Sequence, residues 1–166
     1  MSDNVYLGNP NLKKANTPIE WTEEMMVEFL KCKEDPVYFA KNHVKIVSLD
    51  EGLTQFEPYH FQEKLINNFH SNRFNICKMP RQTGKSTTVV SYLLHYAVFN
   101  DSVNIGILAN KAATARELLG RLQTAYENLP RWMQQGIIAW NKGSLELENG
   151  SKILAASTSA SAVRGM

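Results

Sequence analysis

The chain has 166 residues, and 18 Lys and Arg against 16 Asp and Glu leave a formal net charge of +2 at neutral pH. Hydrophobic residues make up 43% and charged residues 20%, which fits a globular domain and excludes a disordered chain, a collagen or a coiled coil. The chain has two cysteines without metal-ligand spacing and no secretory signal, and no apolar run approaches the ~18 residues of a membrane span. These features exclude a disulfide scaffold and a membrane protein, so we expect a reduced, cytosolic setting without a membrane partner.

The first third of the sequence predicts three kinds of segment. Residues 1–20 are rich in Asn, Pro and Lys without periodicity, which predicts an extended N-terminal arm. Residues 21–57 predict a helical lead-in and a β-hairpin. Thr22 is the expected N-cap of a first helix, and Asp35-Pro36 is expected to begin a second helix that reaches about His43.

A β-hairpin is predicted between these helices and the middle of the chain. Its strands, Lys45–Leu49 and Leu53–Phe56, flank the turn Asp50-Glu51-Gly52. The run Ile46–Glu51 also imitates the apolar strand ending in Asp-Glu that holds Mg²⁺ in NTPases. The following glycine favours a hairpin turn, so we reject this run as the metal site.

Residues 58–166 predict a partial P-loop ATPase core of the α/β class. Apolar patterns predict helices and strands in alternation, which favours a right-handed βαβ arrangement with a parallel sheet. The strand at 103–109 is expected to be covered on both faces, because its apolar run is nearly continuous. The expected elements are helix 58–69, strand Phe74–Met79, helix Ser86–Phe99, strand Val103–Ala109, helix 112–129 and strands Gly136–Trp140, Ser144–Leu147 and Ile153–Ala156.

The strongest functional signal lies between the predicted strand at 74–79 and the helix that follows it. The pattern G-x-x-x-x-G-K-[ST] binds phosphates through backbone amides, a lysine and a Mg²⁺-binding hydroxyl. Here Met79 stands in place of the first glycine, whereas Gly84-Lys85-Ser86 is intact. Gly84 would let the backbone approach the phosphate oxygens, Lys85 would reach the β- and γ-phosphates, and Ser86 would bind Mg²⁺. Arg81 would add a second cation.

Phe61 and Gln62, on the helix before the predicted strand, are candidates for adenine binding. A Gln amide offers a donor and an acceptor that match the Hoogsteen edge of adenine, and a neighbouring aromatic ring can stack on the base. The predicted nucleotide-binding set is Phe61, Gln62, Pro80, Arg81, Gln82, Thr83, Gly84, Lys85, Ser86 and Thr87. The alternative is an ordinary strand-to-helix turn beside a surface Gln.

The motifs together resemble the N-terminal ATPase domain of the large terminase subunit of tailed bacteriophages, closest to the T-even-like myovirus type. The resemblance covers about Leu7 to Met166. Its segments are Leu7–Asn16, Tyr59-His60-Phe61-Gln62 (similar to the adenine-binding Q motif), Arg81–Ser86 (similar to the deviant phosphate loop), Gly106–Lys111, Trp140–Ser144, Gly150-Ser151 and Ala162-Val163-Arg164-Gly165. Phe61 stands where a Tyr is frequent, and the Asp-Glu strand is absent.

The resemblance implies a helicase-like (RecA/ASCE-type) P-loop NTPase with a helical N-terminal extension and added β-hairpins. It implies ATP and Mg²⁺ as cofactors and Lys85 and Arg81 as catalytic residues. Arg164, in a loop of small polar residues, is a candidate arginine finger acting on a neighbouring subunit; the alternative is a surface arginine. The implied partners are double-stranded DNA, the portal protein, the small terminase subunit and further copies in a ring on the prohead portal.

Two other functions remain open at this point. One is another DNA-translocating ATPase, similar to superfamily-two helicases, which share the Q motif and phosphate loop. The second is a nucleotide-binding module without catalysis. Because the chain ends at Met166 before an Asp-Glu strand, we expect a fragment that binds ATP without hydrolysing it efficiently.

Overall fold

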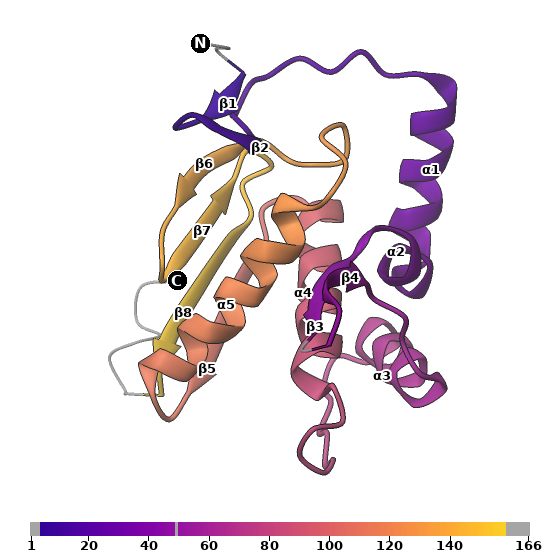
Figure 1. Ribbon diagram of the computed structural model, residues 1–166, viewed down its shortest axis with the longest axis vertical. Coiled ribbons are helices and arrows are strands. Elements are labelled where there is room, and N and C mark those ends of the chain that lie inside the picture. The colour runs from indigo at the N-terminus through magenta and orange to yellow at the C-terminus, as the bar shows by residue number, and fades with distance from the viewer. Residues whose placement is uncertain (1–3, 49, 159–166) are drawn as a thin grey trace.

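The computed structural model describes residues 4–48 and 50–158. These residues form an α/β structure in which four helices lie on one side and a four-stranded sheet on the other, with helix α5 (Ala112–Glu127) between them (Figure 1). The sheet has the order β5-β8-β7-β6, with β5 (Asn104–Ala109) parallel to β8 (Lys152–Ser157). Strands β6 (Ile137–Trp140) and β7 (Ser144–Leu147) are antiparallel, so the sheet is mixed.

The two predicted helix starts in the N-terminal part are confirmed. Helix α1 (Glu23–Glu34) is capped by Thr22, whose hydroxyl oxygen accepts the Met25 amide at 3.2 Å. Helix α2 (Pro36–His43) is capped by Asp35, whose carboxylate accepts two amides of the first turn. These side chains satisfy backbone donors that a helix leaves without partners at its N-terminus.

The predicted β-hairpin after α2 is also confirmed. Strands β3 (Lys45–Ser48) and β4 (Gly52–Gln55) pair antiparallel, and Asp50 and Glu51 lie in the connecting turn. Because these carboxylates are exposed in a tight turn, rejecting them as a buried Mg²⁺ site is supported. Helix α3 (His60–Ser71) follows, slightly later than the sequence predicted.

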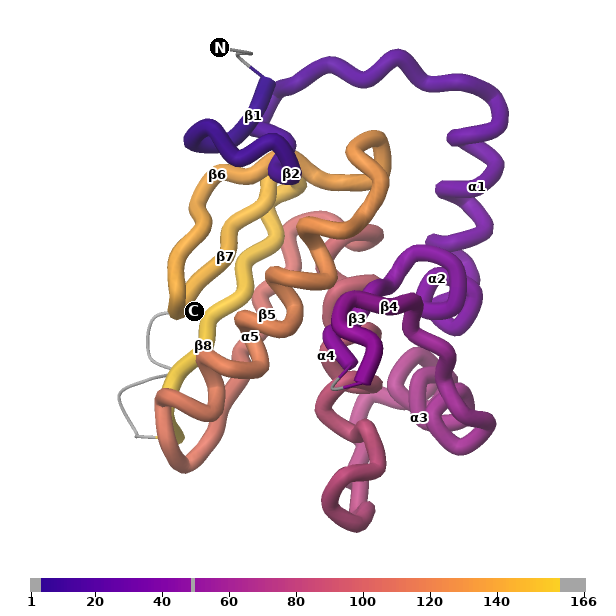
Figure 2. The backbone as a smooth tube through the Cα atoms, in the orientation of Figure 1, coloured from indigo at the N-terminus to yellow at the C-terminus, as the bar shows by residue number. Residues whose placement is uncertain are grey.

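A second hairpin lies within the segment that the sequence predicted as an extended arm. Strand β1 (Val5–Tyr6) pairs with β2 (Asn9–Lys13), and Figure 2 shows this hairpin lying over one end of the sheet. Leu12 is buried there, and the Lys13 amide donates to the side chain of Gln134 at 3.0 Å. These contacts join residues more than a hundred positions apart, so no local pattern could predict them.

Glu148 fastens this hairpin to the sheet. Its carboxylate accepts the amides of Asn16 at 2.8 Å and Gly136 at 2.7 Å, and it pairs with the buried ammonium of Lys13 at 3.2 Å. Burial by itself raises the pKa of Glu148, but the two amides and Lys13 outweigh burial, and the pKa is lowered. The ionised carboxylate is therefore favoured in the folded protein.

We expect Glu148→Gln to lower the free energy of unfolding by about 2 kcal/mol at neutral pH, because Lys13 would stay buried without a counter-charge. A pKa that is lower in the folded state gives stability that is present above the unfolded value and lost as the pH falls through the folded value. The difference between wild type and variant should therefore shrink in acid, as thermal melts across pH would show. Glu146→Gln is the control, because the exposed Glu146–Lys152 pair contributes at most about 1 kcal/mol. Equal effects of both substitutions would contradict the prediction.

The predicted strand at Phe74–Met79 is not formed, which corrects the sequence analysis. Residues 72–84 make a loop that projects away from the sheet (Figure 1), with Ile76 fully exposed and Phe74 83% exposed. A strand needs a neighbouring strand for its backbone hydrogen bonds, and within the described residues β5 is an edge strand with no partner on its outer side. The expected βαβ unit through helix α4 (Lys85–Phe99) is therefore absent from these residues; β5 and β8 form the parallel pair instead.

Strand β5 also differs from its prediction. Ile105 and Ile107 are buried towards α5, whereas Gly106 and Leu108 are exposed on the other face. Helix α5 covers one face of β5 and β8, so the nearly continuous apolar run of β5 is not covered on both faces by the described residues. The helix at 112–129 and the two C-terminal hairpin turns are confirmed.

Helix α4 forms the centre of the helical half. Val90, Leu94 and Val98 are buried between neighbouring helices, together with the polar side chain of His95. Burial lowers the pKa of His95 to about 4, so its ring is neutral near pH 7 and donates Nε2–H to the Cys32 carbonyl oxygen at 2.8 Å. Among the described residues, no helix combines the length and apolarity needed to cross a membrane.

Candidate functional site

The loop before α4 has an unusual backbone. Gln82 and Gly84 have φ values of 61° and 69°, the left-handed region, and α4 begins immediately after Gly84. Within the loop the Thr83 hydroxyl donates to the Pro80 carbonyl oxygen at 3.0 Å. From the first turn of α4, the Thr88 hydroxyl donates to the Gly84 carbonyl oxygen at 2.9 Å. A left-handed conformation costs little at glycine, so Gly84 suits the sharp turn into the helix.

The N-terminus of α4 has no anionic or capping side chain within the described part of the chain. Its first turn contains no acidic residue, and Gly84, its N-cap, has no side chain that could accept a hydrogen bond. The first amides of a helix have no intrahelical acceptor, and the helix dipole adds a partial positive charge there. This end of α4 can therefore bind an anion such as a phosphate group.

Two cations flank the same turn. Lys85 is the first residue of α4 and is half-buried, and Arg81 is exposed in the loop. Neither forms an ion pair with a carboxylate in residues 4–48 or 50–158. Ser86 and Thr87, both half-buried, complete the first turn, and Pro80 and Gln82 are exposed. The predicted phosphate-binding residues thus lie together on one short loop and helix start.

The structure also brings Gln62 to this loop, across 21 positions of sequence. Gln62 is buried, and its Nε2 donates to the Thr83 carbonyl oxygen at 3.3 Å. A Cβ added to Gly84 would clash with Gln62 Nε2, so only glycine lets this amide approach so closely. Gly84 therefore has a packing role that the sequence motif did not reveal.

The amide of Gln62 is engaged by the backbone. While Nε2 contacts Thr83, Oε1 accepts the amide of Tyr59 at 2.8 Å and so caps the start of α3. The neighbouring Phe61 is 45% exposed and stacks on Tyr59, with ring centroids 5.8 Å apart and planes at 10°. The signal for this cap was a Gln three residues after the helix N-cap, a spacing typical of capping boxes.

Two parts of the predicted site are not brought together in the structure. The strand expected to hold the beginning of the loop is absent, so residues 74–80 do not fix the loop against the sheet. Arg164, the candidate arginine finger, lies outside the described residues.

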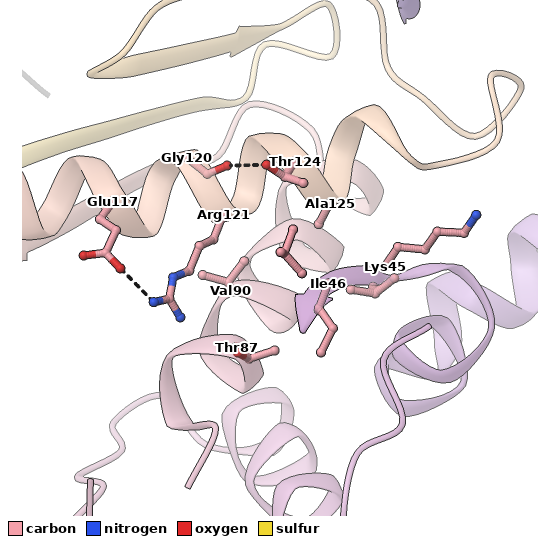
Figure 3. Close-up of a pocket in the computed structure, with 11 residues that line it drawn as sticks. Lys45, Ile46, Thr87, Val90, Glu117, Gly120, Arg121, Thr124 and Ala125 are labelled. Carbon is pink, nitrogen blue, oxygen red and sulfur yellow. Dashed lines mark hydrogen bonds and ion pairs between the residues drawn. The ribbon is translucent and has the colours of Figure 1, made fainter. Parts of the chain in front are cut away.

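A pocket of about 750 Å³ opens beside the first turns of α4. Figure 3 shows it between α4, α5 and β3, with Val90, Ile46 and Ala125 around it and the Arg121–Glu117 ion pair at its rim. Of the predicted nucleotide-binding residues, Thr87 alone lines this pocket. The pocket and the predicted phosphate loop are therefore neighbouring but different surfaces.

Comparison with known families identifies the chain through its C-terminal part. The family described as "Terminase large subunit, T4likevirus-type, N-terminal" matches residues 76–166, which is more than half of the sequence and includes the loop at 80–87. The chain belongs to this terminase family. The resemblance to large terminase subunits is confirmed over residues 76–166.

Membership of the terminase large-subunit family implies a role in phage DNA packaging. Terminase large subunits are ATPases in general, and their partners are DNA and packaging proteins such as the portal and the small subunit. The family match begins within the loop that the sequence predicted as a strand, so both the uncapped helix start and Lys85 lie inside the matched region.

Proposed function

We propose that this chain is the ATP-binding part of a viral DNA-packaging motor, in which ATP hydrolysis is coupled to translocation of double-stranded DNA into a prohead. The observation that carries the proposal is the left-handed Gly84 directly before Lys85 at the uncapped start of α4, inside the terminase-matched region. The motor acts in the host cytoplasm, transiently on the prohead portal, as a ring of copies that contacts the portal protein and the small subunit.

The residues of the loop fit an ATP tail. The amides at the start of α4 bind phosphate oxygens, and Lys85 and Arg81 neutralise the charge that develops on the γ-phosphoryl group. The hydroxyl of Ser86 would hold Mg²⁺, and the ion would supply positive charge that offsets the charge of the phosphates. Gln62 holds the loop backbone at Thr83, and the exposed Phe61 ring is available to stack on adenine.

The proposal includes a RecA-like arrangement of the core. Two features support it: the exposed side chains of Phe74 and Ile76, and the edge of β5, which has no partner strand among residues 4–48 and 50–158. An additional strand between them would pair with this edge and bring the exposed segment into the sheet. Such a strand would place residues 74–79 in the sheet and hold the phosphate loop at its edge, as the sequence pattern predicts.

A nucleotide-binding measurement on the 166-residue chain tests the proposal. We expect a fluorescent ATP analogue to bind, unlabelled ATP to compete, and Mg²⁺ to strengthen binding by roughly tenfold, about 1.4 kcal/mol. Ser86→Ala should lose the Mg²⁺ increment and keep the Mg²⁺-independent binding, whereas the exposed Ser71→Ala should keep both. Hydrolysis by this chain alone should be slow.

The controls separate binding at the loop from nonspecific binding. Binding that ATP cannot displace, or a Mg²⁺ increment that survives Ser86→Ala, would contradict the assignment. Rapid hydrolysis by the chain alone would show that the described loop already has a complete catalytic set.

A further inference from the structure

Three side chains with metal-binding atoms meet where α1 and α2 join. Glu28 and Cys32 belong to α1, His43 is the last residue of α2, and their ligand atoms all lie within 4.8 Å of one another. We propose that Glu28, Cys32 and His43 form a binding site for Zn²⁺ that fastens α1 to α2. This site is separate from the phosphate loop and independent of the proposed ATP binding.

The local folding explains how the triad is brought together. Glu28 and Cys32 are four residues apart on one helix, so they lie on the same face one turn from each other. The break at Asp35 lets α2 return along α1 and places His43 opposite Glu28. The rings of Phe39 and Trp132 flank the His43 ring, each with its centroid 6.3 Å away, and hold its orientation.

The distances suit a tetrahedral ion. His43 Nε2 lies 2.8 Å from Glu28 Oε1, and Cys32 Sγ lies 3.8 Å from the same oxygen. Zinc bonds of about 2.0–2.3 Å place neighbouring ligand atoms about 3.3–3.6 Å apart, between the two observed separations. Small side-chain rotations are therefore enough to form the site.

The surroundings of the triad resemble the outer shell of a metal site. The hydroxyl of Tyr38 donates to Glu28 Oε2 at 3.0 Å, which orients the carboxylate and leaves Oε1 towards the cysteine and histidine. Cys32 is fully buried and the His43 side chain is 13% exposed, whereas that of Glu28 is 26% exposed. Of the three, Glu28 also lines a surface pocket along α1, together with Thr22, Glu23, Glu24, Val27 and Lys31, so its carboxylate is open to solvent on that side.

The donor set selects the kind of ion. The Cys32 thiol, which would release its proton to solvent on binding, and the His43 imidazole favour Zn²⁺ over Mg²⁺ or Ca²⁺, which prefer oxygen ligands only. The ion would join two helices that already share the apolar core and the hydrogen bonds to the Glu28 carboxylate. Because binding involves only the folded arrangement of α1 and α2, it should also stabilise the fold.

Titration of the chelator-treated chain with Co²⁺, a spectroscopic substitute for Zn²⁺, tests the site. We expect a thiolate-to-cobalt charge-transfer band that saturates at one equivalent and disappears when Zn²⁺ is added. Cys32→Ser should abolish the band, whereas Cys77→Ser, at the second of the two cysteines, should keep it. Tyr38→Phe should weaken binding by about 10- to 100-fold.

Circular dichroism of each variant distinguishes loss of the site from loss of the fold. If Cys32→Ser does not fold, His43→Gln decides, because it keeps the thiol and should lose the tetrahedral cobalt spectrum. A folded wild-type chain that shows no band, or a band that depends on Cys77, would overturn the proposal. Glu28 would then be only a hydrogen-bond acceptor, for Tyr38 and His43 of α2 and for Cys32 within α1.

Discussion

Lys85→Ala in the large terminase subunit should lower the turnover of ATP by about 100- to 1,000-fold, the range found when one charge-stabilising group is removed from a reacting centre. The reason is the position of Lys85: it follows the left-handed Gly84 and begins a helix without a capping side chain. Because Lys85 has no carboxylate partner in the described residues, the substitution should leave the melting temperature nearly unchanged.

Steady-state turnover and thermal melting, measured on the same preparations, check this prediction. Lys78→Ala is the matched control, since Lys78 is an exposed cation on the same loop, seven positions earlier. Turnover retained by the Lys85 variant, or an equal loss in the Lys78 variant, would show that the lysine does not act on the phosphates.

Gly136→Ala should be the most destabilising single substitution that we describe. A Cβ at Gly136 would lie 2.5 Å from the Ala15 Cα and 2.5 Å from Glu148 Oε2. Backbone at Ala15 cannot move aside without breaking the hydrogen bond from its amide to the Ile137 carbonyl oxygen. We expect a loss of about 3 kcal/mol from overpacking, or roughly 6–12 °C in melting temperature for a domain of this size.

Gly120→Ala provides the control for this substitution. Gly120 lies in the middle of α5, and an added Cβ there meets nothing within 4 Å. Alanine should stabilise the helix by up to about 1 kcal/mol. Chemical denaturation of both variants should show changes of opposite sign in the free energy of unfolding. A Gly136→Ala protein as stable as wild type would mean that the N-terminal hairpin does not lie against the sheet as described.

Elements with strong local signals could be predicted from the sequence. Thr22 and Asp35-Pro36 specify their helix starts through side chains one turn away, and the turn before Gly52 specifies its hairpin. These structures depend on contacts within a few residues, which a sequence displays directly.

The elements that were predicted wrongly depend on contacts with residues far away in the sequence. The apolar run Phe74–Met79 has the composition of a strand, but composition does not supply the adjacent strand whose hydrogen bonds it needs. The N-terminal hairpin shows the opposite case, because weak local signals are stabilised by Gln134 and Glu148 from the far end of the chain.

In the candidate site, too, the local features could be predicted from the sequence and the long-range contacts could not. Gly84-Lys85-Ser86 is a contiguous motif, and its helix-start geometry follows from a single glycine. That Gln62 would contact the loop at Thr83, rather than present a free amide, could not be predicted, because the contact depends on how α3 packs beside α4.

The bond between Gln62 and Thr83 makes the loop and α3 mechanically continuous. A displacement of the loop backbone at Thr83 must either break this hydrogen bond or move the first turn of α3 as well. The next residue, Glu63, is ion-paired with Lys41 of α2. A displacement of the first turn of α3 would therefore also act on α2. Movement of the loop before α4 can therefore be transmitted to the N-terminal helices through two adjacent side chains, Gln62 and Glu63.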